Sequence, residues 1–231
     1  MEMIWDGLQQ AFALFVHGDP EIFQITWLSL RVSGTAILVS IIIGVPLGTM
    51  LALSESRARK FWLSIVHTGM ALPPVVVGLV ISILLWRTGP LGVLGLMYTP
   101  AAMTTAQFII AAPIVMGLTV SGLQQLDPRL KDQLMGLGAS RLQVVWLLWR
   151  EAKLPLFAAV MVGFGRVIAE VGASMMVGGN LKSSTRVLTT AIVLENSKGN
   201  FALAIALSAI LLSLVFAITL GLTWIQQKEL R

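Results

Sequence analysis

The sequence predicts an all-α integral membrane protein with five transmembrane helices and an N-terminal interfacial helix. Hydrophobic residues make up 56% of its 231 residues and charged residues only 12%, which is about half the charged fraction of a typical soluble domain. The mean hydropathy is +0.86, and the apolar residues gather into five segments of roughly the 20 residues that cross a bilayer. Cysteine is absent, so the chain offers no disulfide framework or thiolate metal site.

Residues 1–24 are expected to form an extracytoplasmic or interfacial segment. Within residues 4–16, apolar side chains recur at near-helical spacing: Trp5, Leu8, Phe12 and Phe15. This pattern predicts a short amphipathic helix that lies in the membrane interface or packs as a strap against the first span. The start of the chain lacks a positively charged region, so we expect no cleavable signal peptide.

Residues 25–231 are expected to form a single transmembrane domain. Its helical spans are predicted at about 26–53, 61–86, 104–126, 154–177 and 201–224. Turn-rich or polar connections are predicted at 87–103 and 181–200. Pro73 and Pro74 remove backbone hydrogen bonds inside the second span, which is tolerated only where neighbouring helices or water satisfy the freed carbonyls.

The polar stretch 127–153 joins the third and fourth spans. Asp127 and Pro128 suit the start of a helix, and Gly138 can supply the left-handed residue that ends one. Ser140 and Gln143 form a capping-box pair for a second helix. We therefore expect two short helices that meet at Gly138 in a compact knob, which would dock onto a partner.

Lysine and arginine are unevenly distributed over the two sides of the membrane. One side holds ten: Arg57, Arg59, Lys60, Arg129, Lys131, Arg141, Arg150, Lys153, Lys228 and Arg231. The other holds five: Arg31, Arg87, Lys182, Arg186 and Lys198. The positive-inside rule places the N-terminus outside and both the C-terminus and the knob in the cytoplasm. Because the net charge of +5 is spread over connections beside the bilayer, it does not indicate a nucleic-acid partner.

The fourth span contains two charged residues, Arg166 and Glu170. They are four positions apart, so a continuous helix would place them on one face, where they can pair. Charges at this depth face a bundle interior or a water-filled path. Two hypotheses remain open: a structural ion pair that fixes packing, or an Arg166 that attracts an anion while Glu170 limits its binding. Gly163, Gly165 and Gly172 would let another helix or a second subunit approach.

Two segments resemble the binding-protein-dependent ABC importer permeases. Asp132 followed by Gly138-Ala139-Ser140, with Leu154-Pro155 downstream, resembles the cytoplasmic EAA loop of that family, although Asp132-Gln133-Leu134 stands in place of Glu-Ala-Ala. Residues 165–180 are similar to the fourth span of tungstate-type permeases, and more distantly to that of molybdate and sulfate permeases. The similarity includes Ala169-Glu170-Val171-Gly172 and Asn180.

The resemblance implies the type I importer (MetI-like) permease fold in a prokaryotic plasma (inner) membrane. It implies a permease subunit that imports an oxyanion, with tungstate as the first expectation and molybdate or sulfate as alternatives. The residues implied in coupling to an ATPase are Asp132, Gln133, Leu134, Leu137, Gly138, Ala139, Ser140 and Arg141. Those for the translocation path or an intramembrane ion pair are Arg166, Glu170, Gly172 and Asn180.

The resemblance also implies three partners besides the lipid bilayer. They are a second copy of the chain, a cytoplasmic ABC ATPase dimer, and an extracytoplasmic oxyanion-binding protein that lands on 87–103 and 181–200. The sequence lacks a Gly-x-x-x-x-Gly-Lys-Ser/Thr phosphate loop, so we expect ATP and magnesium on the ATPase and no cofactor on this chain. No catalytic or metal-ligating constellation is predicted. An ion-coupled carrier that uses Arg166 and Glu170, or a membrane scaffold, remains the alternative from another class.

Overall fold

The computed structural model describes residues 5, 9 and 19–228, and within these it contains helices and connections but no strand. Three helices are long and apolar enough to cross a membrane: α2 (Pro20–Leu53), α5 (Pro100–Gln124) and α11 (Phe201–Lys228). Two bent helix pairs bring the number of candidate spans in the described part to five. The fold-class prediction is confirmed on this count, whereas the interfacial helix predicted at 4–16 lies almost wholly outside the described residues.

Helices α2 and α5 form the centre of the bundle. Asp19 caps α2, its Oδ1 accepting hydrogen bonds from the amides of Glu21 (2.8 Å) and Ile22 (3.2 Å), as expected of an N-cap aspartate. The two helices approach closely at Gly48, where an added Cβ would lie 2.7 Å from the Met116 carbonyl oxygen. Small residues at such crossings let membrane helices pack backbone against backbone.

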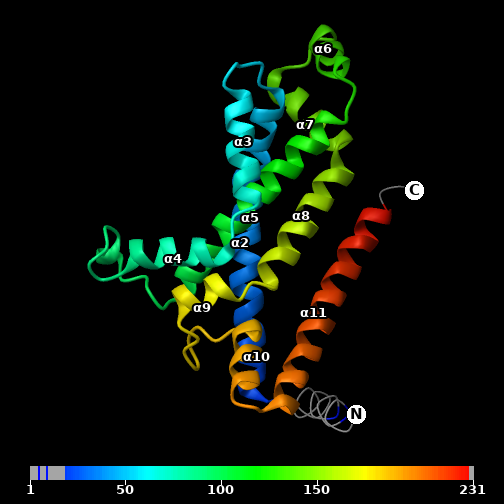
Figure 1. Cartoon of the computed structure of the whole chain (residues 1–231). Coiled ribbons are helices and arrows are strands. Elements are labelled where there is room, and N and C mark those ends of the chain that lie inside the picture. The colour runs from blue at the N-terminus through cyan, green and yellow to red at the C-terminus, as the bar shows by residue number, and fades with distance from the viewer. Residues whose placement is uncertain (1–4, 6–8, 10–18, 229–231) are drawn as a thin grey trace.

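The second predicted span is broken rather than straight. It consists of α3 (Arg59–Met70) and α4 (Pro74–Leu85), which meet at 97°. Pro73 and Pro74 provide no amide donors, so the helix cannot continue through them. Figure 1 shows the consequence: α3 lies along the bundle and α4 points away from it.

The fourth predicted span is also bent. Helix α8 (Lys153–Ile168) and the short α9 (Gly172–Gly178) meet at 56°. One apolar core joins α4, α5 and α9 around Val77, Met103 and Ala173. A second joins α2, α5 and α8 around Ile37, Val115 and Phe164, with α11 packed at its edge.

Two connections differ from the sequence prediction. In the first, a short 3₁₀ turn, η1 (Gly92–Leu94), precedes α5, which begins at Pro100, four residues before the predicted boundary. In the second, residues 181–200 contain a helix, α10 (Leu188–Ser197), where a polar loop was predicted. The Thr190 hydroxyl accepts a hydrogen bond from the Val187 amide (3.1 Å) and so caps its first turn.

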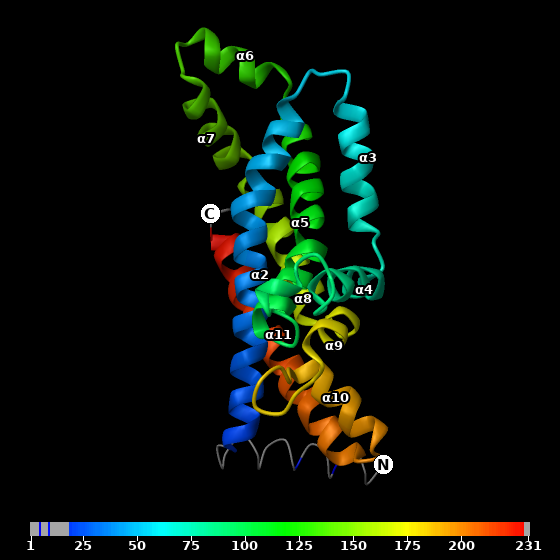
Figure 2. The same cartoon turned by 90° about the vertical axis from the view of Figure 1, so that its left-hand side faces the viewer.

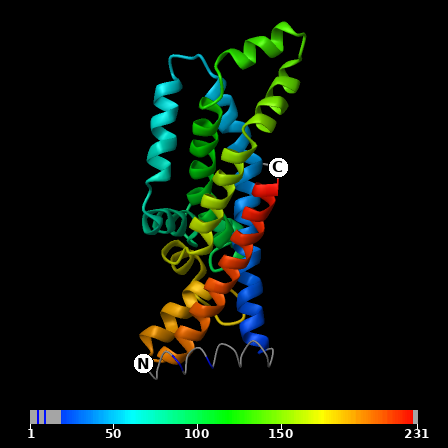
Figure 3. The same ribbon diagram turned by 90° about the vertical axis from the view of Figure 1, so that its right-hand side faces the viewer.

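The molecule is elongated, and its two ends differ in construction (Figures 1 and 2). Helices α6 (Arg129–Gly136) and α7 (Arg141–Glu151) form the knob at one end, and α10 and the start of α2 lie at the other. Helix α11 runs from the α10 end toward the knob end alongside α8 (Figure 3). The long helices therefore connect two ends that can serve different partners.

Candidate functional site

The knob begins and ends as the sequence predicts. The Asp127 carboxylate accepts a hydrogen bond from the Arg129 amide at the start of α6 (2.8 Å). At the other end, the Gly138 amide donates to the Met135 carbonyl (3.0 Å) and the Ala139 amide to the Leu134 carbonyl (3.1 Å). These two bonds form a Schellman motif, with Gly138 at φ +87° in the position that favours glycine.

A capping box then starts α7. The Ser140 amide donates to Gln143 Oε1 (2.7 Å), and the Gln143 amide donates to Ser140 Oγ (3.4 Å). The turn between the two helices is thus held by hydrogen bonds between near neighbours in the sequence. Such a turn keeps its shape independently of the rest of the bundle.

Helix α7 attaches the knob to the long helices. Val144 and Leu148 are buried against Leu123 near the end of α5. The Trp149 indole donates a hydrogen bond to Thr49 Oγ1 on α2 (2.8 Å). Lys131 on α6 pairs with Glu55, just after α2, at 3.1 Å, but this ion pair is exposed and contributes little to stability. The attachment therefore depends mainly on α7.

The knob presents its predicted coupling residues at its surface. Asp132, Gln133, Leu137, Gly138, Ser140 and Arg141 are exposed, and Leu134 and Ala139 are half-buried. Leu137 is 85% exposed, and so is Leu142 at 83%, a residue that the sequence analysis did not select. The sequence feature that could have identified Leu142 is its position as the second residue of α7, directly after the capping box begins at Ser140. These two exposed leucines make the knob a candidate surface for a protein partner.

The second candidate region is the break between α8 and α9. Helix α8 ends at Ile168, and Glu170 follows with its side chain only 4% exposed. Glu170 Oε1 accepts a hydrogen bond from the Ala173 amide (2.9 Å), and the Glu170 carbonyl oxygen accepts one from Thr189 Oγ1 on α10 (2.9 Å). Glu170 therefore fixes the start of α9 and links the break to α10.

The predicted ion pair between Arg166 and Glu170 is not formed. The four-residue spacing assumes a continuous helix, but the helix ends between the two residues. Arg166 remains exposed on α8, while the Glu170 carboxylate turns toward the α9 backbone. The structural-pair hypothesis is corrected by this geometry, and any role of either residue in translocation remains a proposal.

The segments around the α8–α9 break pack closely against neighbouring helices at glycines. A Cβ on Gly172 would lie 2.9 Å from Val75 Cγ2, and one on Gly78 would lie 2.7 Å from the Ala173 Cα. Gly163 likewise admits the Ile37 side chain, whereas nothing lies within 4 Å of a Cβ on Gly165. Close approach was predicted at Gly163, Gly165 and Gly172, and the structure places a neighbouring side chain against Gly163 and Gly172.

Asn180 closes the turn after α9. Its backbone lies at φ +50°, and its Nδ2 donates to the Thr190 carbonyl (3.3 Å). Thr185 Oγ1 donates to the Gly178 carbonyl (2.5 Å). Asn180 thus fixes the connection to α10, and its side-chain oxygen is buried without a recorded hydrogen bond.

Ion pairs join the start of α2 to the connection before α10. Glu21 contacts Lys182 at 2.8 Å and Arg186 at 3.4 Å. Near the end of α10, a hydrogen bond from the Lys198 ammonium, assisted by one from Asn200, holds the pKa of Glu195 below its usual value of 4.5. The charged side chains at this end are therefore largely engaged with one another.

Comparison with known proteins identifies the family to which the chain belongs. The profile of the family described as "Binding-protein-dependent transport system inner membrane component" matches residues 44–230. The chain belongs to this family. It is similar to the tungstate uptake system permease protein TupB of Peptoclostridium acidaminophilum, with 41% identity over 228 residues, covering 99% of this chain and 100% of the relative. It is also similar to TupB of Campylobacter jejuni, with 36% identity over 218 residues, covering 94% and 91%.

A solved structure agrees with the predicted fold type. An inward-facing conformation of the MetNI methionine ABC transporter matches with a TM-score of 0.77 at 18% identity, covering 91% of this chain and 97% of that one. At this identity the likeness concerns the fold alone. The protein therefore has the MetI-like permease fold of type I importers. Its family membership, shown by the profile match and the permease relatives, makes it a transport subunit.

Proposed function

We propose that this permease imports an oxyanion, tungstate in the first instance, into the cytoplasm by alternating access. The observation that carries the proposal is the knob, a rigid, doubly capped helix pair that exposes Leu137 and Leu142 at one end of a membrane bundle. The full-length similarity to the tungstate uptake permeases supports the choice of substrate. Molybdate and sulfate remain the alternatives that the experiment must separate.

The knob is proposed as the coupling element for a cytoplasmic ABC ATPase dimer. Its internal hydrogen bonds preserve its shape under load, and α7 transmits its movement to α5 and α2 through Leu148 and Trp149. ATP and magnesium would bind to the ATPase, and this chain would contribute no catalytic residue and no cofactor. Coupling to a cytoplasmic ATPase requires the knob to be cytoplasmic. The lysine and arginine distribution predicts this orientation, with the N-terminus outside.

The remaining partners are a second copy of the chain and an oxyanion-binding protein. The second copy is proposed because few candidate spans are available to enclose a path. The binding protein would dock at the α10 end, over the connections 87–103 and 181–200. We assign Glu170, Gly172 and Asn180 to the element that shapes the path, since they hold α9 against α4 and α10. Arg166, exposed on α8, is the residue on this stretch free to offer positive potential to an anion.

Uptake by the assembled system tests the proposal. The chain, its candidate ATPase and its candidate binding protein are reconstituted in liposomes, and ATP-dependent uptake is measured for tungstate, molybdate and sulfate in turn. Preferential uptake of tungstate is expected. Uptake of another oxyanion would correct the substrate, and ATP-independent uptake driven by an ion gradient would establish the carrier alternative instead.

Gly138→Asp tests the coupling role. A side chain at φ +87° is strained and would disturb the exposed turn, so we expect the variant to insert but to lose ATPase binding and transport. Gly199→Asp is the matched control, because Gly199 also has a positive φ (+76°) and open space but lies at the opposite end. Because Gly199 lies in the connection proposed to contact the binding protein, the two variants are compared by ATPase binding alone. ATPase binding that Gly138→Asp retains, or that Gly199→Asp loses equally, would contradict the assignment.

A further inference from the structure

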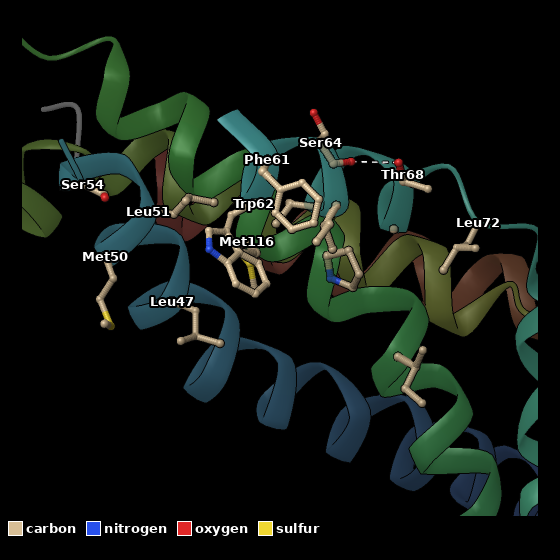
Figure 4. Close-up of a pocket in the computed structure, with 15 residues that line it drawn as sticks. Leu47, Met50, Leu51, Ser54, Phe61, Trp62, Ser64, Thr68, Leu72 and Met116 are labelled. Carbon is tan, nitrogen blue, oxygen red and sulfur yellow. Dashed lines mark hydrogen bonds between the residues drawn. The ribbon is translucent and has the colours of Figure 1, made fainter. Parts of the chain in front are cut away.

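An apolar groove of about 870 Å³ lies between α2, α3 and α5 at the knob end of the molecule (Figure 4). Helix α3 contacts α5 near its own C-terminal end, where Gly69 meets Pro113. Of the residues of α3, only Val66 is buried, and most of the others are exposed, so the contact with the bundle is confined to one side of the helix. The space that remains is lined almost wholly by carbon, from residues that include Leu47, Leu51, Trp62, Ile65 and Met116.

A second pocket with cationic walls adjoins this groove. It has a volume of about 540 Å³ and shares Met50 and Ser54 with the groove. Lys131 on α6 and Arg141 on α7 line it, together with apolar side chains, and no acidic residue is among its lining. Lys131 already pairs with Glu55, whereas no ion pair is recorded for the exposed Arg141 among the described residues.

The charge around the two pockets extends onto the turn between α2 and α3. Arg57 and Lys60 are exposed there, and no ion pair with a described residue is recorded for either. The apolar groove therefore has cationic side chains at one end. Apolar walls favour a hydrocarbon chain, and lysine and arginine just outside the membrane favour an anionic headgroup.

We propose that the groove binds an acyl chain of an anionic phospholipid, whose phosphate lies against Lys131 and Arg141. The proposal rests on the orientation given under the proposed function, because the knob must lie at a lipid surface on its own side of the membrane. A neutral lipid would fill the groove but would bring no net negative charge to Arg141. The bound lipid would connect α3 to both knob helices, so the composition of the membrane would influence how firmly the knob is held.

Fluorescence quenching tests binding directly. The full chain is placed in nanodiscs of phosphatidylcholine that contain a small fraction of brominated phosphatidylglycerol or, separately, the same fraction of brominated phosphatidylcholine. Trp62 lines the groove, and its contribution is the difference between the wild type and Trp62→Phe. Because Lys131 is already paired with Glu55, the net positive charge of the pocket is about that of Arg141 alone. We therefore expect phosphatidylglycerol to quench Trp62 at roughly fivefold lower mole fraction, the factor that one such cation contributes.

Trp224 provides the matched control for lipid contact. It is 72% exposed on α11 and does not line the groove, so the difference between the wild type and Trp224→Phe should show equal quenching by the two lipids. Equal quenching of Trp62 by both lipids would show that the headgroup is not recognised and would overturn the proposal. Absence of quenching by either lipid would also overturn it, because the groove would then be covered by protein, such as a second copy.

Charge removal tests the headgroup site. In Lys131→Gln/Arg141→Gln, the preference of Trp62 for phosphatidylglycerol should disappear while quenching by phosphatidylcholine persists. Lys182→Gln, at the opposite end, should keep the preference. A preference that survives in the double variant would contradict the assignment of the headgroup. These measurements require neither ATPase nor transport, so their failure is distinct from failure of the proposed function.

Discussion

The knob and the α8–α9 break are both interruptions of helical structure, but they are held in different ways. In the knob, the bonds that define the turn join residues within five positions of one another, such as Ala139 to Leu134. In the break, a local bond from the Ala173 amide to Glu170 is joined by contacts between distant residues, such as Thr189 to Glu170 and Gly78 to Ala173. The knob can therefore move as a unit without losing its shape, whereas the break changes only when neighbouring helices move.

The difference suits the proposed function, in which an ATPase drives transport from outside the chain. In that proposal the knob is the docking element, and its local hydrogen bonds would preserve its shape when a partner engages it. The break is the proposed translocation element, and its contacts between helices would make it respond when α4, α9 and α10 move relative to one another. The four predictions below test this division between local and distant support, in order of expected effect.

The largest effect is expected for Gly78→Leu, at the crossing of α4 and α9. An added Cβ would lie 2.7 Å from the Ala173 Cα, and a larger side chain must push the helices apart, at a cost near the upper end of the usual range of about 1 to 3 kcal/mol. Thermal unfolding in detergent measures the loss. Gly165→Leu, where nothing lies within 4 Å of a Cβ, is the control and should be at least as stable as wild type. A tolerated Gly78→Leu would show that the break is not held by this contact.

The second prediction concerns the buried carboxylate. Glu170→Ala removes the acceptor for the Ala173 amide and should lower the free energy of unfolding by about 1 to 3 kcal/mol. Glu170→Gln keeps an oxygen acceptor and should recover most of the loss. Equal destabilisation by both variants would show that the charge, rather than the hydrogen bond, is what the position requires.

The third prediction concerns the cap of α7. Ser140→Ala removes one half of the capping box and should cost about 1 kcal/mol locally. Hydrogen exchange should therefore accelerate about fivefold for the first amides of α7, including that of Gln143. Amides of α9 should exchange as in the wild type. Faster exchange in α9 as well would show that the knob and the break are not independent.

The smallest effect is expected for Glu195→Gln, near the end of α10. Because Lys198 holds the pKa of Glu195 below 4.5 in the folded protein, this carboxylate adds stability above its unfolded pKa and loses it as pH falls through the folded value. The variant should therefore melt slightly below the wild type at neutral pH, and the gap in melting temperature should narrow as the pH falls below 4.5. An unchanged gap at low pH would show that the contribution does not depend on ionisation.

The sequence predicts those parts of the structure that depend on near neighbours. Gly138 has a positive φ, and Ser140 and Gln143 form the capping box, as expected, because caps and turns are defined within a few residues. The long helices are predicted for a similar reason, since hydrophobic length suffices. The pair Pro73-Pro74 indicates a disturbed span, but the 97° angle depends on the docking of α4 against α9 and cannot be derived from the prolines alone.

The parts that escape prediction depend on distant partners. Helix α10 buries Leu188 and Ala191 against Ile25 of α2 and Leu207 of α11, and Thr189 donates a hydrogen bond to the Glu170 carbonyl. The stretch is therefore ordered where a loop was expected. The pairing of Arg166 with Glu170 fails because the Ala173 amide, at the start of a new helix, offers the carboxylate a nearer partner. Competition of this kind is visible only once the helix is known to end at Ile168.

The sharp turn between α3 and α4 also has a consequence for depth. Helix α3 contains 12 residues, which corresponds to a rise of about 18 Å, whereas the hydrocarbon layer is about 30 Å thick. Helix α4 also contains 12 residues, so neither half of the second span is long enough to cross the layer alone. Because the two halves meet at 97°, their lengths do not add along one direction.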